Sequence, residues 1–149
     1  MNFIVQLSKT KQEYDFIFVV VDWLSKWAHF ISTHTNATAP QIAQLFFKHI
    51  FVHHGLPQVI VSDQNPKFTS QFWKTLFKNL GTKLAMSSAH HPQTDGQTER
   101  MNRTLEEMIR TFVNHKQDNW DECLPAAEFA YNNSKQASTG FTPFYLDCG

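Results

Sequence analysis

The chain has 149 residues, with thirteen lysines and arginines balanced by thirteen aspartates and glutamates, and 42% of its residues are hydrophobic. Such a length is typical of one domain with a hydrophobic core, and the composition excludes a disordered chain. The apolar runs are far shorter than the ~20 residues that span a bilayer, and the N-terminus lacks the pattern of a secretory signal, so we expect an intracellular protein of the nucleus or cytoplasm and no membrane partner.

The first part of the chain predicts three strands. Residues 1–7 alternate loosely between apolar and polar side chains, and the polar segment Ser8–Tyr14 that follows predicts a hairpin turn. The aromatic and β-branched run Phe16–Val21 is typical of a central strand that is buried on both faces. Trp27–Ile31 predicts the third strand.

Helices and strands then alternate. Thr38 and Pro40 are suited to the start of a helix, which Gly55–Pro57 ends. A short strand follows at Gln58–Ser62. We then expect a helix at Ser70–Leu80 and a fifth strand at Lys83–Met86.

The last part of the chain is predicted to be helical after an irregular segment. Ser87–Gly96 contains proline, aspartate and glycine and is expected to be an irregular, mobile loop. Helices are expected at Gln97–His115 and Trp120–Asn133. Three meandering strands followed by strand–helix crossovers predict an α/β fold with a mixed five-stranded sheet flanked by helices.

Two carboxylates stand at positions that suit chemistry. Asp63 follows a buried strand, and the carboxyl ends of strands in α/β sheets border the crevice where ligands bind. The alternative for Asp63 is a turn-forming aspartate before Asn65 and Pro66. Glu99 lies near the start of the long helix, opposite its apolar stripe, where the helix dipole alone also favours a glutamate.

The two carboxylates together are more informative than either alone. They are separated by 35 residues that contain a helix, a strand and the segment rich in polar residues. A carboxylate at the end of a strand and a carboxylate on a helix can converge on hard divalent cations such as Mg²⁺ or Mn²⁺. Two such cations can hold the attacking and leaving oxygens of a phosphodiester.

These residues resemble the integrase catalytic core of gypsy-type long-terminal-repeat retrotransposons, within the retroviral integrase superfamily. The resemblance rests on the string His-Pro-Gln-Thr-Asp-Gly-Gln-Thr-Glu-Arg at 91–100, on Ser62-Asp63, and on Thr139–Phe144. It covers nearly the whole chain and implies a ribonuclease-H-like fold. We therefore expect residues 1–149 to form one integrase core with a truncated first strand and without the flanking zinc and C-terminal domains.

The resemblance implies a metal-dependent polynucleotidyl transferase that processes DNA 3′ ends and transfers strands. It assigns Asp63 and Glu99 as catalytic residues that hold two Mg²⁺ or Mn²⁺ ions. Asn2 stands where the family has the first aspartate of its metal-binding triad, in the context Met1–Ile4. An amide oxygen can bind a cation but carries no negative charge.

The replacement at Asn2 predicts that DNA integration by this chain is weak or absent. Asp22, which ends the second predicted strand, is a candidate substitute for the missing aspartate; the alternative is an aspartate that forms a turn.

The expected partners are DNA, both at the element ends and in the target, and a second copy of the chain. Seven basic residues against four acidic ones lie between residues 67 and 110, and phosphate contacts from such residues position DNA without reading its sequence. Arg103 is the strongest candidate for a DNA contact, followed by Gln64, His91 and Asn102. The content of four tryptophans and fourteen phenylalanines suits a homodimer with a buried apolar interface.

Two other functions remain open at this point. The first is a non-catalytic relic of an integrase that retains the fold and still binds DNA or oligomerises. The second is an unrelated nuclease of the ribonuclease H type, which would need a fuller set of carboxylates.

Overall fold

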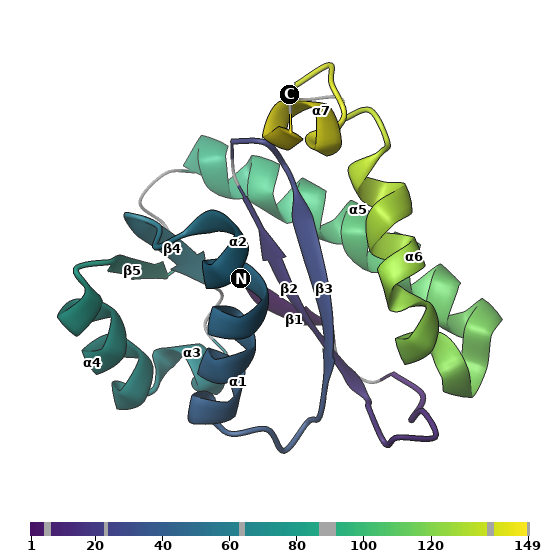
Figure 1. The fold of residues 1–149 in the computed structure, drawn as a ribbon, viewed down its shortest axis with the longest axis horizontal. Helices are drawn as coiled ribbons and strands as arrows, with labels where there is room; N and C mark the ends of the chain where they lie inside the picture. The colour runs from purple at the N-terminus through teal and green to yellow at the C-terminus, as the bar shows by residue number, and fades with distance from the viewer. Residues whose placement is uncertain (5–6, 23, 63–64, 87–91, 137–138, 149) are drawn as a thin grey trace. The chain divides into compact units, whose positions relative to one another are not determined.

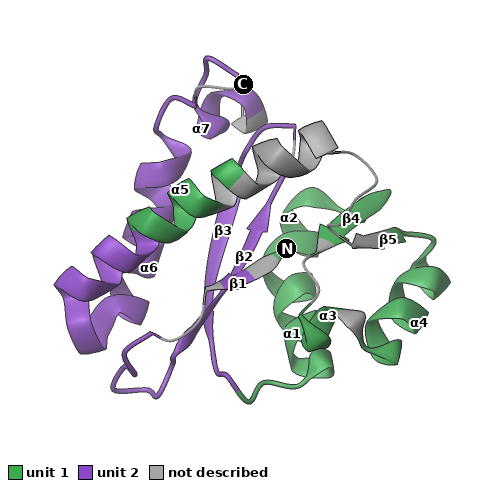
Figure 2. Ribbon diagram, turned by 180° about the vertical axis from the view of Figure 1, so that it is seen from behind, with its two compact units in different colours: residues 1–2, 36–108 green, residues 3–35, 109–149 purple. Residues whose placement is uncertain are grey.

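A computed structural model of the chain forms two compact units (Figure 2). Unit 1 comprises Met1–Asn2 and Asn36–Met108, and unit 2 comprises Phe3–Thr35 and Ile109–Gly149. The structure describes residues 1–4, 7–22, 24–62, 65–86, 92–136 and 139–148.

A three-stranded sheet in the order β1-β2-β3 belongs to unit 2, except for Asn2 at the start of β1, which belongs to unit 1 (Figure 1). Strand β1 is Asn2–Ile4, β2 is Phe16–Val21 and β3 is Ala28–Thr33. Strands β2 and β3 are antiparallel, with Phe16 opposite Thr33 and Val21 opposite Ala28. Strand β2 has a neighbour on each side and all its residues except Val21 are buried, which confirms the predicted central strand.

Helix α6, Trp120–Asn132, runs beside β3 and supplies hydrogen bonds to its outer edge (Figure 1). The Asn132 side chain accepts a hydrogen bond from the Ala28 amide and donates one to the Ala28 carbonyl, both at 2.9 Å. A carboxylate oxygen of Glu128 accepts from the Phe30 amide at 2.8 Å. These side chains therefore satisfy backbone groups that an edge strand would otherwise leave open.

Unit 1 begins with a helical segment in three parts. Helix α1, Ala39–Phe46, continues into the π-helical turn η1, Phe47–Phe51, and into α2, Val52–His54. Thr38 caps α1 through the Gln41 amide, and the Gln41 side chain accepts in return from the Thr38 amide. Gly55 ends the segment with a φ of 72°, as the sequence predicted.

A parallel pair of strands forms the sheet of unit 1. Strand β4, Val59–Ser62, pairs with β5, Lys83–Met86, so that Ser62 lies opposite Met86. Helix α4, Gln71–Leu80, connects them, capped by Ser70 and ended by Gly81 in the left-handed conformation. A short helix that the sequence did not predict, α3 at Pro66–Thr69, precedes α4.

An aromatic cluster forms the core of unit 1. Trp73 of α4 is fully buried and stacks on Phe77 with ring centroids 4.9 Å apart. Phe68 of α3 meets the same ring edge-on at 5.8 Å, and Phe46 of α1 meets it edge-on at 6.3 Å. Each of the three helices therefore contributes a ring to one packed cluster, which fixes α3 against α1 and α4.

Helix α5, Pro92–Lys116, begins earlier than the sequence predicted. The expectation of an irregular segment up to Gly96 is wrong for its second half, and residues 87–91 lie outside the described residues. Proline is favoured in the first helical turn because its missing N–H would be unpaired there, so Pro92 starts the helix where it was expected to prevent one. The buried stripe of α5 is formed by Leu105, Ile109 and Val113.

The remaining elements are helical. A 3₁₀ turn, η2 at Gln117–Asn119, joins α5 to α6, and α7 at Pro143–Cys148 follows near the end of the chain. All five predicted strands are present in the described residues. Strands β2 and β3 pair in antiparallel orientation, and β4 and β5 pair in parallel. Within the same residues, no helix is long and apolar enough to cross a bilayer.

Candidate functional site

The parallel strands of unit 1 end at one edge of a sheet, and each is followed in the sequence by a predicted site segment. Strands β4 and β5 run in the same direction, so their carboxyl ends at Ser62 and Met86 lie side by side. The chain continues from β4 into Asp63 and Gln64, and from β5 into a segment that ends with His91. These three predicted site residues lie outside the described residues, but the strands that lead to them end at the same edge.

The start of the chain lies against the same strand. The backbone nitrogen of Met1 donates a hydrogen bond to the Val61 carbonyl at 2.7 Å. Asn2 directly follows Met1, and Asp63 comes two residues after Val61. This contact therefore places the backbone of Asn2 close to the point where β4 leads into Asp63.

Helix α5 carries the remaining predicted residues. For Glu99 and Asn102 the structure describes the helical backbone but not the side chain, whereas Arg103 is described and exposed. Residues four apart lie on the same face of a helix, so Arg103 shares a face with Glu99. The residue ranges of unit 1, 1–2 and 36–108, include positions 2, 63 and 99.

The turn that follows Asp63 and Gln64 is held by features that the sequence analysis missed. The Asn65 side chain caps α3 by accepting from the Lys67 amide at 3.0 Å. The Lys67 ammonium donates to the Ala37 carbonyl, which precedes α1. An asparagine before a proline is a recognisable helix start, but no local signal in the sequence could have revealed a partner thirty residues away.

Asp22 has a structural role in the turn between β2 and β3. One of its carboxylate oxygens accepts from the Ser25 amide at 2.9 Å and from the Ser25 hydroxyl at 2.6 Å. The Asp22 backbone carbonyl accepts a hydrogen bond from the Lys26 amide. Burial lowers the pKa of the Lys26 ammonium, and the charge of Asp22 acts in the opposite direction. These bonds support the turn-forming interpretation of Asp22 and leave Asp63 and Glu99 as the candidate metal-binding carboxylates.

The predicted donors have the chemistry of a site for hard cations. Two carboxylates and an amide oxygen, from Asp63, Glu99 and Asn2, are the types of ligand that Mg²⁺ and Mn²⁺ prefer. Within the described residues, no three His, Cys, Asp or Glu side chains gather as metal ligands. The Asp63 residue and the Glu99 side chain are not among those residues.

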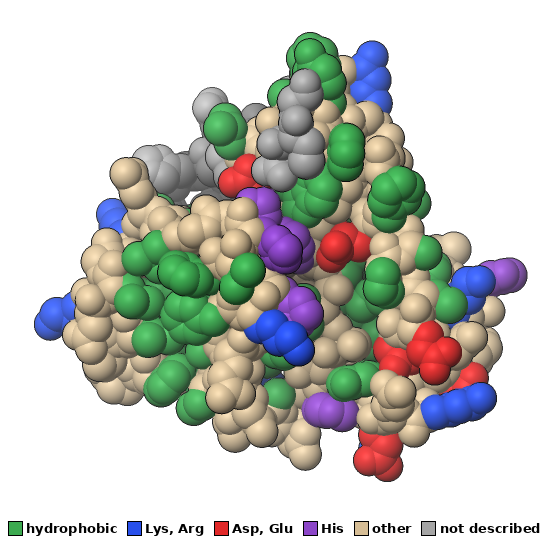
Figure 3. Space-filling view, in the orientation of Figure 1, with side chains coloured by type: hydrophobic (Ala, Val, Ile, Leu, Met, Phe, Trp, Pro, Cys, Tyr) green, Lys and Arg blue, Asp and Glu red, His purple; other side chains and the backbone are tan. Residues whose placement is uncertain are grey.

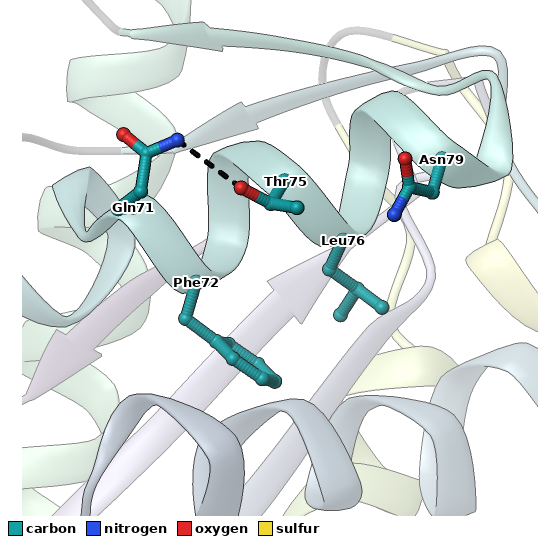
Figure 4. Close-up of a pocket in the computed structure, with 5 residues that line it drawn as sticks. All are labelled: Gln71, Phe72, Thr75, Leu76 and Asn79. Carbon is teal, nitrogen blue, oxygen red and sulfur yellow. Dashed lines mark hydrogen bonds between the residues drawn. The ribbon is translucent and has the colours of Figure 1, made fainter.

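A separate hollow lies on the outer face of α4 (Figure 4). It has a volume of about 390 Å³ and is lined by Gln71, Phe72, Thr75, Leu76 and Asn79. Phe72 and Leu76 point to the same side of the helix, and the Gln71 amide donates to the Thr75 hydroxyl at 3.1 Å. None of these side chains is charged, so the hollow offers no ligand set for a cation and suits apolar contact instead.

Comparison with known families and proteins identifies what the chain is similar to. The integrase core domain family matches residues 2–92. The Tf2-3 and Tf2-4 transposon polyproteins of the fission yeast Schizosaccharomyces pombe are each 35% identical to it over 146 residues. The match covers 98% of this chain and 11% of each polyprotein, so the chain spans about a tenth of the length of these relatives.

Solved structures show the same fold. The catalytic core domain of BIV integrase is 22% identical, covering 99% of this chain and 93% of that one, with a TM-score of 0.69. The HTLV-2 integrase catalytic core in complex with magnesium is 21% identical, covering 98% and 93%, with a TM-score of 0.68. The chain of a simian T-cell lymphotropic virus intasome, in complex with the PP2A regulatory subunit B56 gamma, is 21% identical. The match covers 99% of this chain and 53% of that one, with a TM-score of 0.72. The predicted ribonuclease-H-like α/β fold is thus confirmed.

Proposed function

The chain belongs to the integrase core domain family, and from this premise we propose that it is the core of a gypsy-type retrotransposon integrase that acts on DNA ends. The observation that supports the proposal most directly is the contact between Met1 and Val61, because Asn2 follows Met1 and Asp63 comes two residues after Val61 in the sequence. Residues 1–149 act as one core, within a nucleus or cytoplasm where DNA is accessible.

Asp63 and Glu99 are the residues that hold divalent cations in this proposal. Mg²⁺ or Mn²⁺ bound there would polarise a phosphodiester and stabilise the charge that develops on its oxygens. In the sequence, Asp63 directly follows β4, and Glu99 belongs to the first turns of α5. Asn2 adds an oxygen donor without charge, and the weaker site that results predicts impaired catalysis.

The proposed DNA contacts are residues that flank the two carboxylates in the sequence. Arg103 is exposed one turn after Glu99 on α5, where its guanidinium can reach a phosphate next to the metal-binding carboxylate. Gln64 follows Asp63, His91 precedes α5, and Asn102 lies beside Arg103. Together they would hold the DNA backbone while water, and later a freed 3′-hydroxyl, attacks phosphorus in line with the leaving oxygen.

A second copy of the chain completes the proposal. Hydrophobic side chains gather on the surface of unit 1 over α4 and the adjoining helices (Figure 3). Among the described side chains of this unit, the exposed large hydrophobic ones are Phe51, Val52, Leu56, Val59, Val61, Phe72 and Leu80. Apolar side chains gathered on a surface are typical of protein interfaces, which supports a homodimer.

The competing function is a non-catalytic relic that binds DNA or oligomerises, which the neutral amide of Asn2 favours. Release of a strand from a branched DNA that mimics the strand-transfer product, in Mn²⁺, separates the two. We expect slow release by the chain, none by Asp63→Asn, and unchanged release by Glu122→Gln, which alters an exposed carboxylate on α6. No release by either the chain or Asn2→Asp, with DNA still bound, would favour the relic.

A further inference from the structure

Two histidines lie about one helical turn apart on the segment that follows α1. His49 belongs to the π-helical turn η1 and His53 to α2, and the two elements are continuous in the chain. Residues four apart lie on the same face of a helix, so the two imidazoles belong to one side of this segment. A π-helical turn inside a helix is rare and is frequently found at functional sites, which draws attention to this pair.

Electrostatics and exposure agree with a pair of neighbouring rings that solvent can reach. Burial lowers the pKa of the His49 imidazole from 6.5, and the charges of Lys48 and then of His53 lower it further. An effect of His53 on His49 requires that the two rings lie near each other. His53 is exposed and His49 is half-buried, so an ion in solution has access to the pair.

We propose that His49 and His53 form a binding site for a transition-metal ion such as Zn²⁺. Imidazole nitrogens suit zinc, copper and nickel, whereas Mg²⁺ and Mn²⁺ prefer oxygen ligands. Two histidines four apart on one helix face also bind zinc in the H-E-x-x-H motif. Within the described residues, no three His, Cys, Asp or Glu side chains gather as metal ligands. The proposed site therefore has two protein ligands, with water in the remaining positions around the ion.

A bound ion would hold the end of the helical segment. It would join a ring of η1 to a ring of α2 across the turn in which the Gly55 amide donates a hydrogen bond to the Phe51 carbonyl at 2.8 Å. Helix α2 has only three residues before Gly55, so this end of the segment is short of other helical turns that could support it. Zinc binding therefore predicts slower hydrogen exchange of the Gly55 amide.

The test titrates Zn²⁺ into the chain and into matched histidine variants, with hydrogen exchange of the Gly55 amide followed with and without zinc. All proteins carry Asp63→Asn, so that binding at the proposed carboxylate site does not contribute. The variants are His49→Gln, His53→Gln and the two together. The control is His54→Gln, which removes an exposed histidine of α2 that is adjacent to His53 and therefore does not share its face.

Two histidines that bind one ion predict losses that are not additive, because either imidazole alone cannot hold the ion between two ligands. Each single substitution should raise the dissociation constant for Zn²⁺ at least about tenfold, and the double variant should bind no more weakly than either one. His54→Gln should bind like its parent, and zinc should slow the exchange of the Gly55 amide in both.

Three results would overturn the proposal. The first is unchanged zinc affinity in either single variant. The second is a loss in the double variant equal to the product of the single losses, which indicates two independent sites. The third is Gly55 exchange that zinc leaves unchanged in the parent, a result that needs no histidine variant. The proposal does not depend on the proposed function, because the titration contains no DNA and neither histidine belongs to the carboxylate site.

Discussion

In the proposed function, Asn2 stands at the position of the first metal-binding carboxylate, so an amide takes the place of a charged ligand there. Asn2→Asp restores a negative charge at this position. Two divalent cations would bring four positive charges to the site, whereas Asp63 and Glu99 supply two negative ones. We expect Asn2→Asp to release the strand from branched DNA at least about tenfold faster than the unaltered chain. Even mutations of residues that only orient metal ligands reduce metal affinity or activity by roughly 10–100-fold. Tenfold corresponds to about 1.4 kcal/mol of barrier.

The control for this substitution is Asn36→Asp, which adds the same charge at an exposed position of unit 1. It should leave the rate unchanged. Equal rates for the unaltered chain and Asn2→Asp in Mn²⁺ would show that residue 2 is not a metal position.

His49 makes stability depend on pH. Burial, followed by the charges of Lys48 and His53, lowers the pKa of its imidazole from 6.5. Between the lowered pKa and 6.5 the unfolded chain binds more protons than the folded one, so stability falls as the pH drops through that window. We expect the loss of Tm between about pH 7.5 and about pH 5.5 to be smaller in His49→Gln than in the unaltered chain.

His115→Gln is the matched control, because it removes an exposed histidine at the end of α5. Its Tm should follow that of the unaltered chain across the same range. A loss of Tm in His49→Gln as large as in the unaltered chain contradicts this account of His49.

At the scale of elements, the attachment of α6 to β3 is the interaction most open to measurement. Asn132 is 1% exposed and bonds both the amide and the carbonyl of Ala28. Asn132→Ala leaves both groups buried without a partner, at about 1–3 kcal/mol each, so we expect a loss of about 2–6 kcal/mol in urea unfolding. Asn133→Ala removes a single bond of an exposed side chain and should cost under about 1 kcal/mol. Equal losses in the two variants would show that the attachment contributes little.

The elements that the sequence predicted well are those with a local signal. Strand β2 follows from its unbroken β-branched and aromatic run, and α4 from its apolar spacing between Ser70 and Gly81. The start of α5 was missed because Pro92 and Gly96 were read as helix breakers, while a proline in the first turn is compatible with a helix. Helix α3 was missed because four residues are too few to show a period.

The candidate site was predictable as a set of residues and not as a geometry. Asp63 and Glu99 follow from chain position and resemblance alone. The contact of Met1 with Val61 and the bond of Lys67 to Ala37 join residues far apart in the sequence, and no local pattern encodes such pairs. Asp22 was predictable from local sequence, because its side chain bonds Ser25, only three residues away. These hydrogen bonds agree with the interpretation of Asp22 as a turn residue.

At the scale of the whole molecule, exposed apolar surface predicts self-association. The described residues leave exposed hydrophobic side chains on both units, among them Phe72 of unit 1 and Phe129 of unit 2. Burial of such surface against a second copy is favourable by roughly 25 cal/mol per Å². We expect light scattering at tens of micromolar to give about twice the chain mass of 17.3 kDa. A strict monomer at that concentration contradicts the homodimer.

The central claim, that Asp63 and Glu99 form the cation site of an integrase core, is tested most directly by titrating the chain with Mn²⁺ in the absence of DNA. The account predicts saturable binding that is lost in Asp63→Asn and in Glu99→Gln, and that is retained in Glu122→Gln. Saturable binding of equal affinity in all four proteins, or no binding by the unaltered chain and by Asn2→Asp alike, would contradict it.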